Sequence, residues 1–370
     1  MNRLVVTIWW ALLLVSTAGS MFPQDYPVDR NPKPMFWRGR SQATGTRTPG
    51  KELVQWNGSF VDRTHKKIAF TMVGTDPSKS NISSVITVWV IPVKMVFDKS
   101  HGDKTFDPRH KLSNGRTIIQ NILDSPIFQP GIDFKQGPTD LGKTQYMDAF
   151  ERGTWWGKNV KKNNKYHILL KPVMMSEQTI DCTDPSCTVH FDDASLAGVA
   201  GTQYLAGFAD RAYYDSQIQT FMRNLGATPD ILPLFIIYDT FLLDGGLCCV
   251  GGYHSANGTQ PSGQTYADAT YVDKVNVFAQ DVSALSHELG EWMDDPFVDN
   301  QVNCQDNNLL EVGDPLEAGK NFGAFRYKLN GFTYNLQSLV FIGYFGAPRT
   351  DSANQWLSFQ NDEQSVCPGQ

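Results

Sequence analysis

The chain has 370 residues, of which 41% are hydrophobic and 19% are charged, and this balance excludes intrinsic disorder because there is ample apolar material for a core. The formal net charge is −6, from 32 basic and 38 acidic residues. A mildly acidic chain lacks the basic field that holds nucleic acid, so we expect no nucleic-acid partner.

The acidic residues divide unevenly into 30 Asp and 8 Glu. Asp favours turns and loops, whereas Glu favours helices. The composition therefore predicts a β-rich domain of the α+β class with few helices. Four of the eight Glu fall within residues 288–317, and that segment also carries the most informative motif of the chain.

Residues 1–18 have the composition of a signal peptide. Arg3 supplies a positive charge, residues 4–15 form an apolar run, and Ser16-Thr17-Ala18 is a small-x-small cleavage pattern. The run is short for a membrane span, although an uncleaved membrane anchor is the alternative interpretation. We expect cleavage after Ala18, a secreted, extracellular or periplasmic location, and no membrane span in the mature chain.

The next segment, residues 19–50, is rich in Pro, Arg, Gly and Thr, which predicts an extended N-terminal arm with little structure of its own. Residues 51–370 show no repeat and no clear linker, so we expect one domain. Its first elements are a hairpin turn at residues 56–59 and a buried strand at residues 82–97. Within that strand, Pro92 predicts a bulge or an end to the hydrogen-bonded ladder.

Further along the chain, the predicted elements follow from apolar spacing and turn residues. Residues 118–123 predict a short helix, and residues 214–225 predict a longer helix that ends before Gly226. Residues 277–293 predict the most regular helix, because their apolar residues recur at helical spacing. The predicted elements are a loop at 98–116, a helix at 118–123, strands at 166–173 and 232–238, a helix at 214–225, a Cys- and Gly-rich loop at 244–266, a helix at 277–293 and more strand at 332–345.

Six cysteines in an exported chain indicate disulfide bonds. Cys182 and Cys187 enclose a turn sequence, so we expect them to pair with each other. Cys248 and Cys249 are adjacent, and a bond between neighbours would be strained. Each is therefore expected to reach a distant partner, with Cys304 and Cys367 as the candidates, and the sequence leaves open which pairs with which.

The predicted helix 277–293 contains His287-Glu288-Leu289-Gly290-Glu291. Positions four apart lie on one face of a helix, so the His287 imidazole and the Glu291 carboxylate can point at one ion. Glu288 is rotated from His287 by about 100°, where it can take a proton from a nearby water. Glu311 follows twenty residues after Glu291.

Residues 284–315 resemble the active-site region of zincin metallopeptidases, in particular the gluzincin type. The resemblance implies a zincin-like core around residues 232–315, with the strand 232–238 beside the helix. It implies His287, Glu291 and Glu311 as metal ligands and Glu288 as the general base. It further implies zinc as the cofactor and a peptide or protein as the substrate.

One position departs from the family pattern, because Glu291 stands where the second histidine of H-E-x-x-H is expected. Two carboxylates and one imidazole cancel both charges of a divalent ion, so bound water becomes less acidic. An oxygen-rich ligand set also favours manganese, iron or calcium over zinc. Near the motif, His254 and Asp314 are candidates for further ligands.

Two alternatives to a peptidase remain open at the level of the sequence. The same residues could hold a structural cation in a secreted binding module whose aromatic-rich surface binds a glycan or a cell-surface partner. Alternatively, the chain could be an inactive relative of a peptidase without metal. In that case Glu291 should be paired with protein groups such as Arg326 or Lys328.

Overall fold

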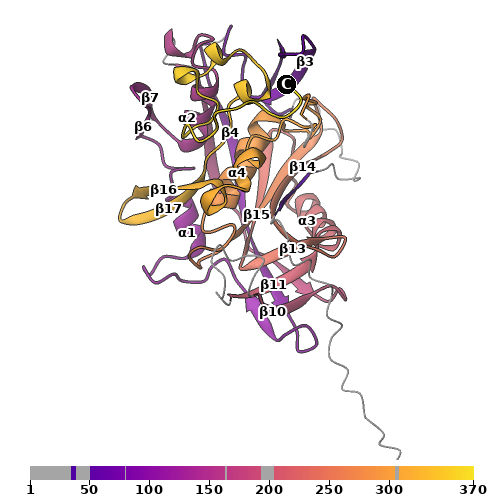
Figure 1. Ribbon diagram of the computed structural model, residues 1–370. Coiled ribbons are helices and arrows are strands. Elements are labelled where there is room, and N and C mark those ends of the chain that lie inside the picture. The colour runs from indigo at the N-terminus through magenta and orange to yellow at the C-terminus, as the bar shows by residue number, and fades with distance from the viewer. Residues whose placement is uncertain (1–34, 39–50, 80, 163–164, 193–203, 305–307) are drawn as a thin grey trace, which may run out of the picture.

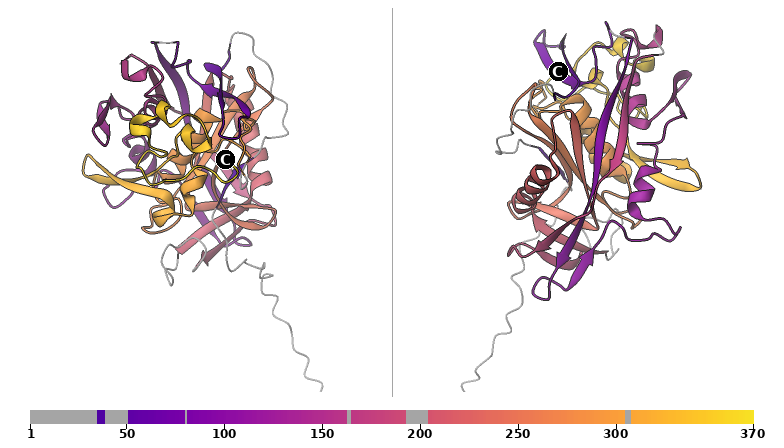
Figure 2. Two further views of the ribbon diagram at one scale, coloured as in Figure 1. Left: turned by 45° about the horizontal axis from the view of Figure 1, so that its top comes forward. Right: turned by 180° about the vertical axis from the view of Figure 1, so that it is seen from behind.

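The computed structural model describes residues 35–38, 51–79, 81–162, 165–192, 204–304 and 308–370. The predicted signal peptide, 1–18, and all of the predicted arm except 35–38 lie outside the described residues. Within the described part, eleven strands form one mixed sheet, and helices pack on both of its faces (Figure 1, Figure 2). This strand-rich architecture confirms the predicted α+β class.

The centre of the sheet is built from four strands, of which β12 (Ile231–Tyr238), β14 (Leu247–Asn257) and β15 (Gln264–Tyr271) are almost entirely buried. β4 (Ser83–Phe97) is parallel to β12, and β12 is parallel to β15. β14 runs antiparallel to β15. Parallel strands covered on both faces read as continuous apolar runs, which is why the segment around β12 was recognisable as a strand.

Shorter strands extend this centre on both sides. β4 pairs with β8 (His167–Met174) up to Val90 and with β9 (Gln178–Cys182) from Val93 onwards. The hydrogen-bonded partner therefore changes around Pro92, while β4 itself continues. Three separate hairpins complete the strands of the described residues. The remaining strands of the main sheet are β1 (Met35–Arg38), β5 (Lys104–Phe106), β8 (His167–Met174), β9 (Gln178–Cys182), β10 (Thr188–Asp192), β11 (Tyr204–Asp210) and β13 (Thr240–Asp244), and the hairpins are β2 (Gln55–Val61) with β3 (Lys67–Val73), β6 (Ile132–Gln136) with β7 (Thr139–Thr144) and β16 (Ala324–Leu329) with β17 (Phe332–Gln337).

Two hydrophobic clusters lie on opposite faces of the sheet, because alternate residues of a strand point to opposite sides. Leu234 of β12 belongs to the larger cluster, and its neighbour Phe235 belongs to the smaller one. The larger cluster contains α4 (Ser283–Asp294) and α2 (Tyr146–Thr154), and the smaller one contains residues of α3 (Arg211–Leu225). The sheet therefore separates two hydrophobic cores.

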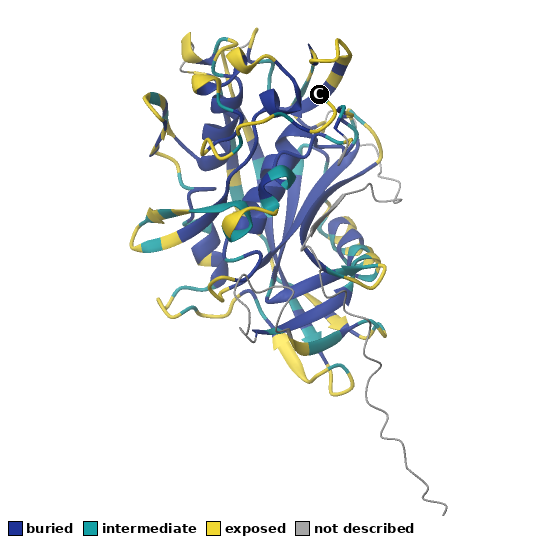
Figure 3. Cartoon of the chain, viewed as in Figure 1, coloured by how far each residue is buried: buried dark blue, intermediate teal, exposed yellow. Residues whose placement is uncertain are grey.

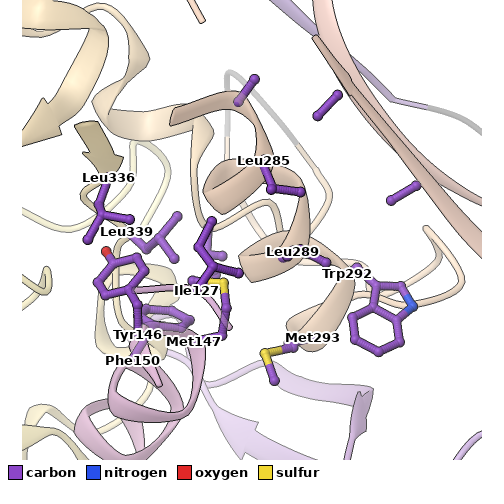
Figure 4. Packing of buried hydrophobic residues seen from close by; sticks show 14 of the residues in the cluster. Ile127, Tyr146, Met147, Phe150, Leu285, Leu289, Trp292, Met293, Leu336 and Leu339 are labelled. Carbon is purple, nitrogen blue, oxygen red and sulfur yellow. The ribbon is translucent and has the colours of Figure 1, made fainter. Parts of the chain in front are cut away.

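Helix α4 is held in the middle of the larger cluster. Figure 4 shows its apolar residues, among them Leu289, Trp292 and Met293, in one buried cluster with Met147 and Phe150 of α2. Every residue of α4 is buried, as the dark helix at the centre of Figure 3 shows. Burial of each large apolar side chain stabilises the folded state by about 1.5–3 kcal/mol. Because α4 buries such side chains all around the helix, its position in the core is well fixed.

Several predicted elements agree with the structure in type and approximate position. The predicted helices at 118–123 and 214–225 correspond to α1 (Ile118–Leu123) and α3. α1 begins with a capping box in which Thr117 and Gln120 satisfy each other's backbone N–H groups. α3 ends at Gly226 in the left-handed conformation. The strands predicted at 82–97, 166–173 and 232–238 correspond to β4, β8 and β12.

Other predictions about local structure were wrong. The segment 244–266 is not a loop, since it contains β14 and the start of β15, whose Gly, Ser and Asn residues are buried by pairing with neighbouring strands. The turn predicted at 56–59 lies inside β2, and the chain reverses at 62–66 instead. The motif helix begins at Ser283 rather than 277, and the last predicted strand ends at Gln337.

Three disulfides join the six cysteines in pairs. The Cys182–Cys187 bond was predicted correctly. The expectation that Cys248 and Cys249 reach distant partners was wrong, because these neighbours are bonded to each other in β14. Their candidate partners, Cys304 and Cys367, instead bond to one another, with Cα atoms 5.6 Å apart and within the normal range for a disulfide. No helix of the described residues is long and apolar enough to cross a lipid bilayer.

Candidate metal centre

Helix α4 brings three acidic or imidazole side chains of the motif to one place. His287, Glu288 and Glu291 are all buried. The helix approaches β17 closely, since Gln337 donates its backbone N–H to the Ser286 hydroxyl at 2.8 Å. The packing on α4 is so close that a Cβ at Gly290 would lie 2.5 Å from the Leu339 side chain. Packing therefore sets the direction in which the three motif side chains point.

On one side of the helix, His287 contacts two carboxylates. Its Nε2 atom lies 2.9 Å from Glu291 Oε1 and 3.5 Å from Asp314 Oδ1. Burial alone would lower the pKa of His287, but Glu291 and Asp314 outweigh that effect and raise the pKa to about 9. In the absence of a cation, the imidazole therefore keeps a proton between these carboxylates at neutral pH.

The segment after Glu311 fits closely against this pair. Gly313 donates its backbone N–H to Glu291 Oε1 at 3.2 Å. A Cβ at Gly313 would lie 2.4 Å from His287 Nδ1, so a side chain does not fit there. Gly313 thus orients both the imidazole and the carboxylate, a role that the sequence did not reveal.

On the other side, β14 contributes His254, which was predicted only as a further ligand. Its Nδ1 atom lies 3.4 Å from Glu288 Oε2 and 3.7 Å from Glu291 Oε2. Its Nε2 atom donates to the backbone carbonyl of Asp295 at 3.1 Å. Burial lowers the pKa of His254 to about 4, so the ring is neutral at pH 7.

Glu288 lies over the backbone of the sheet, and a glycine makes room for it. A Cβ at Gly252 would be 2.9 Å from Glu288 Cγ and 2.8 Å from the carbonyl oxygen of Asp268. Among the described residues, no hydrogen-bond partner reaches the buried Glu288 Oε1 atom. Burial, followed by the charges of Glu291 and Glu311, raises the pKa of Glu288 well above its ordinary value.

These contacts define two three-residue groups that share Glu291. One group is His254, Glu288 and Glu291, and the other is His287, Glu291 and Asp314. Two ligands of one tetrahedral ion are roughly 3.3–3.6 Å apart when each bond is about 2.0–2.2 Å long. The observed separations of 2.9–3.7 Å are close to that spacing. The donors of either group could therefore hold a divalent ion.

The predicted ligand Glu311 is buried nearby but belongs to neither group. Its Oε2 atom lies 3.9 Å from His254 Nε2. Asp314 occupies the place beside His287 that the resemblance gave to Glu311. Arg326 and Lys328, the partners considered for Glu291 in a metal-free chain, are exposed on β16, whereas the contacts described for Glu291 are with His254, His287 and Gly313.

Part of the predicted N-terminal arm lies beside this centre. β1 pairs its backbone in parallel with β14, with Arg38 in register with His254. These four residues form a strand, and the rest of the predicted arm lies outside the described residues. β13 pairs with residues 247–250 of β14, and β1 continues from Val250, which is in register with both strands, to His254.

Comparisons with known proteins add no information about identity. No protein-family model, no curated protein and no solved structure matches this chain. The interpretation of the centre therefore depends on its own residues and geometry.

Proposed function

We propose that the chain is a secreted metal-dependent hydrolase that cleaves peptide bonds in peptides or proteins. The observation that carries this proposal is the convergence of His287 Nε2, Glu291 Oε1 and Asp314 Oδ1 at separations that suit ligands of one ion. Imidazole and carboxylate donors together fit a divalent ion. Zinc is the ion that the family resemblance implies, and the two carboxylates also suit manganese, iron or calcium.

Glu288 is the proposed general base. When bound, a divalent ion would supply Lewis acidity that polarises the carbonyl group of the substrate. Glu288 would take a proton from the attacking water and pass it to the amine that leaves. Its buried position raises its pKa, which favours proton uptake, and its Oε1 atom makes no hydrogen bond to a described residue. Gly252 leaves the space into which this carboxylate projects.

The disulfide bonds support an extracellular role. The three disulfides of the described chain are characteristic of proteins that mature in an oxidising compartment. A signal peptide at residues 1–18 would deliver the chain there. A secreted location also gives access to protein substrates outside the cell.

The test compares the mature protein with its Glu288→Gln variant, using fluorescently labelled casein and loading with zinc or manganese. Glutamine keeps the shape of the side chain but cannot take the proton, so the rate should fall by about 10²–10⁴-fold. Metal analysis should still find at least one equivalent bound to the variant. The exposed residue Glu52 provides a matched control, and Glu52→Gln should keep full activity. A Glu288→Gln variant that hydrolyses casein at the normal rate would refute the mechanism.

Burial of the centre favours a second candidate function. His254, His287, Glu288 and Glu311 are at most 1% exposed, which suits a structural cation as well as a catalytic one. The chain would then be a binding module. A surface pocket of about 410 Å³ presents the half-buried Trp56, which packs on the buried Phe70 and Trp155, as an aromatic surface for a glycan. This candidate predicts that a chelator lowers the melting temperature while casein remains uncleaved under every metal condition.

A further inference from the structure

The two groups of candidate ligands share one carboxylate. Glu291 directs Oε1 toward His287 and Oε2 toward His254. A carboxylate whose two oxygens face different sets of donors has the arrangement of a bridging ligand between two ions. The proposed hydrolase requires one ion in the group of His287, which leaves the group of His254 unexplained.

The tautomer of His254 provides an independent observation. A backbone carbonyl can only accept, so the contact with Asp295 places the proton on Nε2. The Nδ1 lone pair then faces carboxylate oxygens of Glu288 and Glu291 at 3.4 and 3.7 Å. Facing lone pairs repel one another unless a cation lies between them. A metal-ligating histidine commonly donates its second ring N–H to a backbone carbonyl in this way.

A proton on Glu288 is the simplest competing explanation. A protonated Glu288 would donate to His254 Nδ1, but 3.4 Å is longer than a good O–H hydrogen bond. In addition, the second oxygen of Glu288 is buried without a hydrogen-bond partner from the described part of the chain. The positions of both Glu288 oxygens are therefore better explained by a cation bound beside them than by a proton.

The number of buried carboxylates around the centre also favours bound cations. Glu288, Glu291, Glu311 and Asp314 carry four negative charges when ionised, and two divalent cations carry four positive charges. Buried carboxylates are costly unless their charge is compensated. The two groups contain three carboxylates and two histidines, and Glu311 is buried beside them. This set is close to the four carboxylates and two histidines of di-iron and di-manganese sites in helical bundles, although the donors here come from β14, α4 and the segment that follows Glu311.

We infer that the centre binds two divalent transition-metal ions bridged by Glu291, the second of them held by His254, Glu288 and Glu291. This inference rests on the proposed function for the first ion. Glu288 would bind the second ion through Oε2, which faces His254, and keep Oε1 for proton transfer. The oxygen-rich donor set favours manganese or iron.

The experiment is a Mn²⁺ titration of the full mature protein after removal of metal with a chelator. Bound equivalents are measured by calorimetry and elemental analysis, and electron paramagnetic resonance reports whether the ions are magnetically coupled. We expect two equivalents and a coupled spectrum for the wild-type protein. His254→Ala and His287→Ala should each retain one equivalent and lose the coupling. His110→Ala, in a histidine that stacks on Tyr238 away from the centre, is the matched control and should keep both.

The other outcomes separate this inference from the proposed function. One equivalent that disappears in His287→Ala and persists in His254→Ala would overturn the second site and leave the hydrolase proposal intact. One equivalent with the opposite pattern would overturn both the bridged pair and the ligands proposed for the hydrolase. No bound manganese in a wild-type protein with a native circular dichroism spectrum would overturn the bridged pair, and no bound zinc in a parallel titration would overturn the hydrolase proposal as well.

Discussion

Gly313 and His287 are in such close contact that a single added carbon atom would collide with the imidazole. The backbone of Gly313 has φ −88° and ψ −38°, which any residue can adopt. The glycine is therefore required by the space beside His287 and not by its own conformation. This contact allows the ligand geometry to be disturbed without removing a ligand.

The first prediction follows from that contact. Gly313→Ala should displace the His287 ring and weaken manganese or zinc binding by about 10–100-fold, as expected for a residue that orients a ligand. Gly343→Ala is the control, because its Cβ would have its nearest neighbour at an ordinary 3.4 Å. Calorimetry on both variants measures the effect, and equal affinities would argue against His287 as a ligand.

The second prediction concerns the core that holds α4. Trp292 is fully buried and donates its indole N–H to Thr265 Oγ1 at 3.0 Å. Trp292→Ala should lower the free energy of unfolding by about 3–5 kcal/mol, because it leaves a cavity and an unsatisfied hydroxyl. Val275→Ala, at a position that is 57% exposed, should change it by less than about 0.5 kcal/mol. Urea unfolding of the two variants makes the comparison.

The third prediction concerns pH, at a group remote from the centre. Burial, then the charge of Asp273, raises the pKa of Asp239 to about 8 against an ordinary value of 3.8. The folded state therefore binds more protons than the unfolded state between about pH 4 and 8, so this group lowers stability as pH rises through that window. The slope is at most about 1.4 kcal/mol per pH unit.

Asp239→Asn removes this titration while keeping an acceptor for the Tyr204 hydroxyl, which lies 2.6 Å from Asp239 Oδ1. The variant should therefore gain stability relative to the wild-type protein as pH increases from 5 to 8. Thermal melts at four or five pH values measure the difference. A constant difference across this range would show that Asp239 keeps the same charge in both states.

The fourth prediction compares two disulfides. Cys304 and Cys367 are 63 positions apart, whereas Cys182 and Cys187 are 5 apart. In the loop-entropy model, removal of the long bridge by Cys304→Ser with Cys367→Ser costs about 4 kcal/mol, and removal of the short one costs about 2 kcal/mol. The long bridge also encloses Glu311 and Asp314, so its loss should weaken metal binding. Similar metal affinity in both double variants would show that the loop keeps its shape unaided.

The sequence allowed prediction of elements whose signals are local. The apolar run of β12 and Gly226 at the end of α3 each act within a few residues, and each was interpreted correctly. The short helix at 118–123 was also predicted, although its capping box became visible only in the structure. β14 was missed because its Gly, Ser and Asn residues favour turns in isolation. Pairing with β15 and contact with α4 override that preference.

In the candidate centre, too, the contacts within one helix were predictable and the contacts between distant segments were not. Helical spacing correctly brought His287 and Glu291 together, because both belong to one rigid element. Spacing could not decide between Glu311 and Asp314, since these residues follow a loop whose path depends on tertiary contacts. The carbonyl of Asp295 and the space at Gly252 had no signal in the sequence, because their roles arise from a strand and a helix that meet only after folding.

The pairing of β1 with β14 has a consequence for the order of folding. Arg38 and His254 are in register although 216 positions separate them in the chain. Closing so long a loop carries a large entropic cost, and contacts of this kind form late. β1, the first strand of the described residues, must therefore wait for β14, β15 and α4 to assemble. We expect the edge beside His254 to stay accessible to ions until that last ladder closes, so that metal loading and the final folding step compete in time.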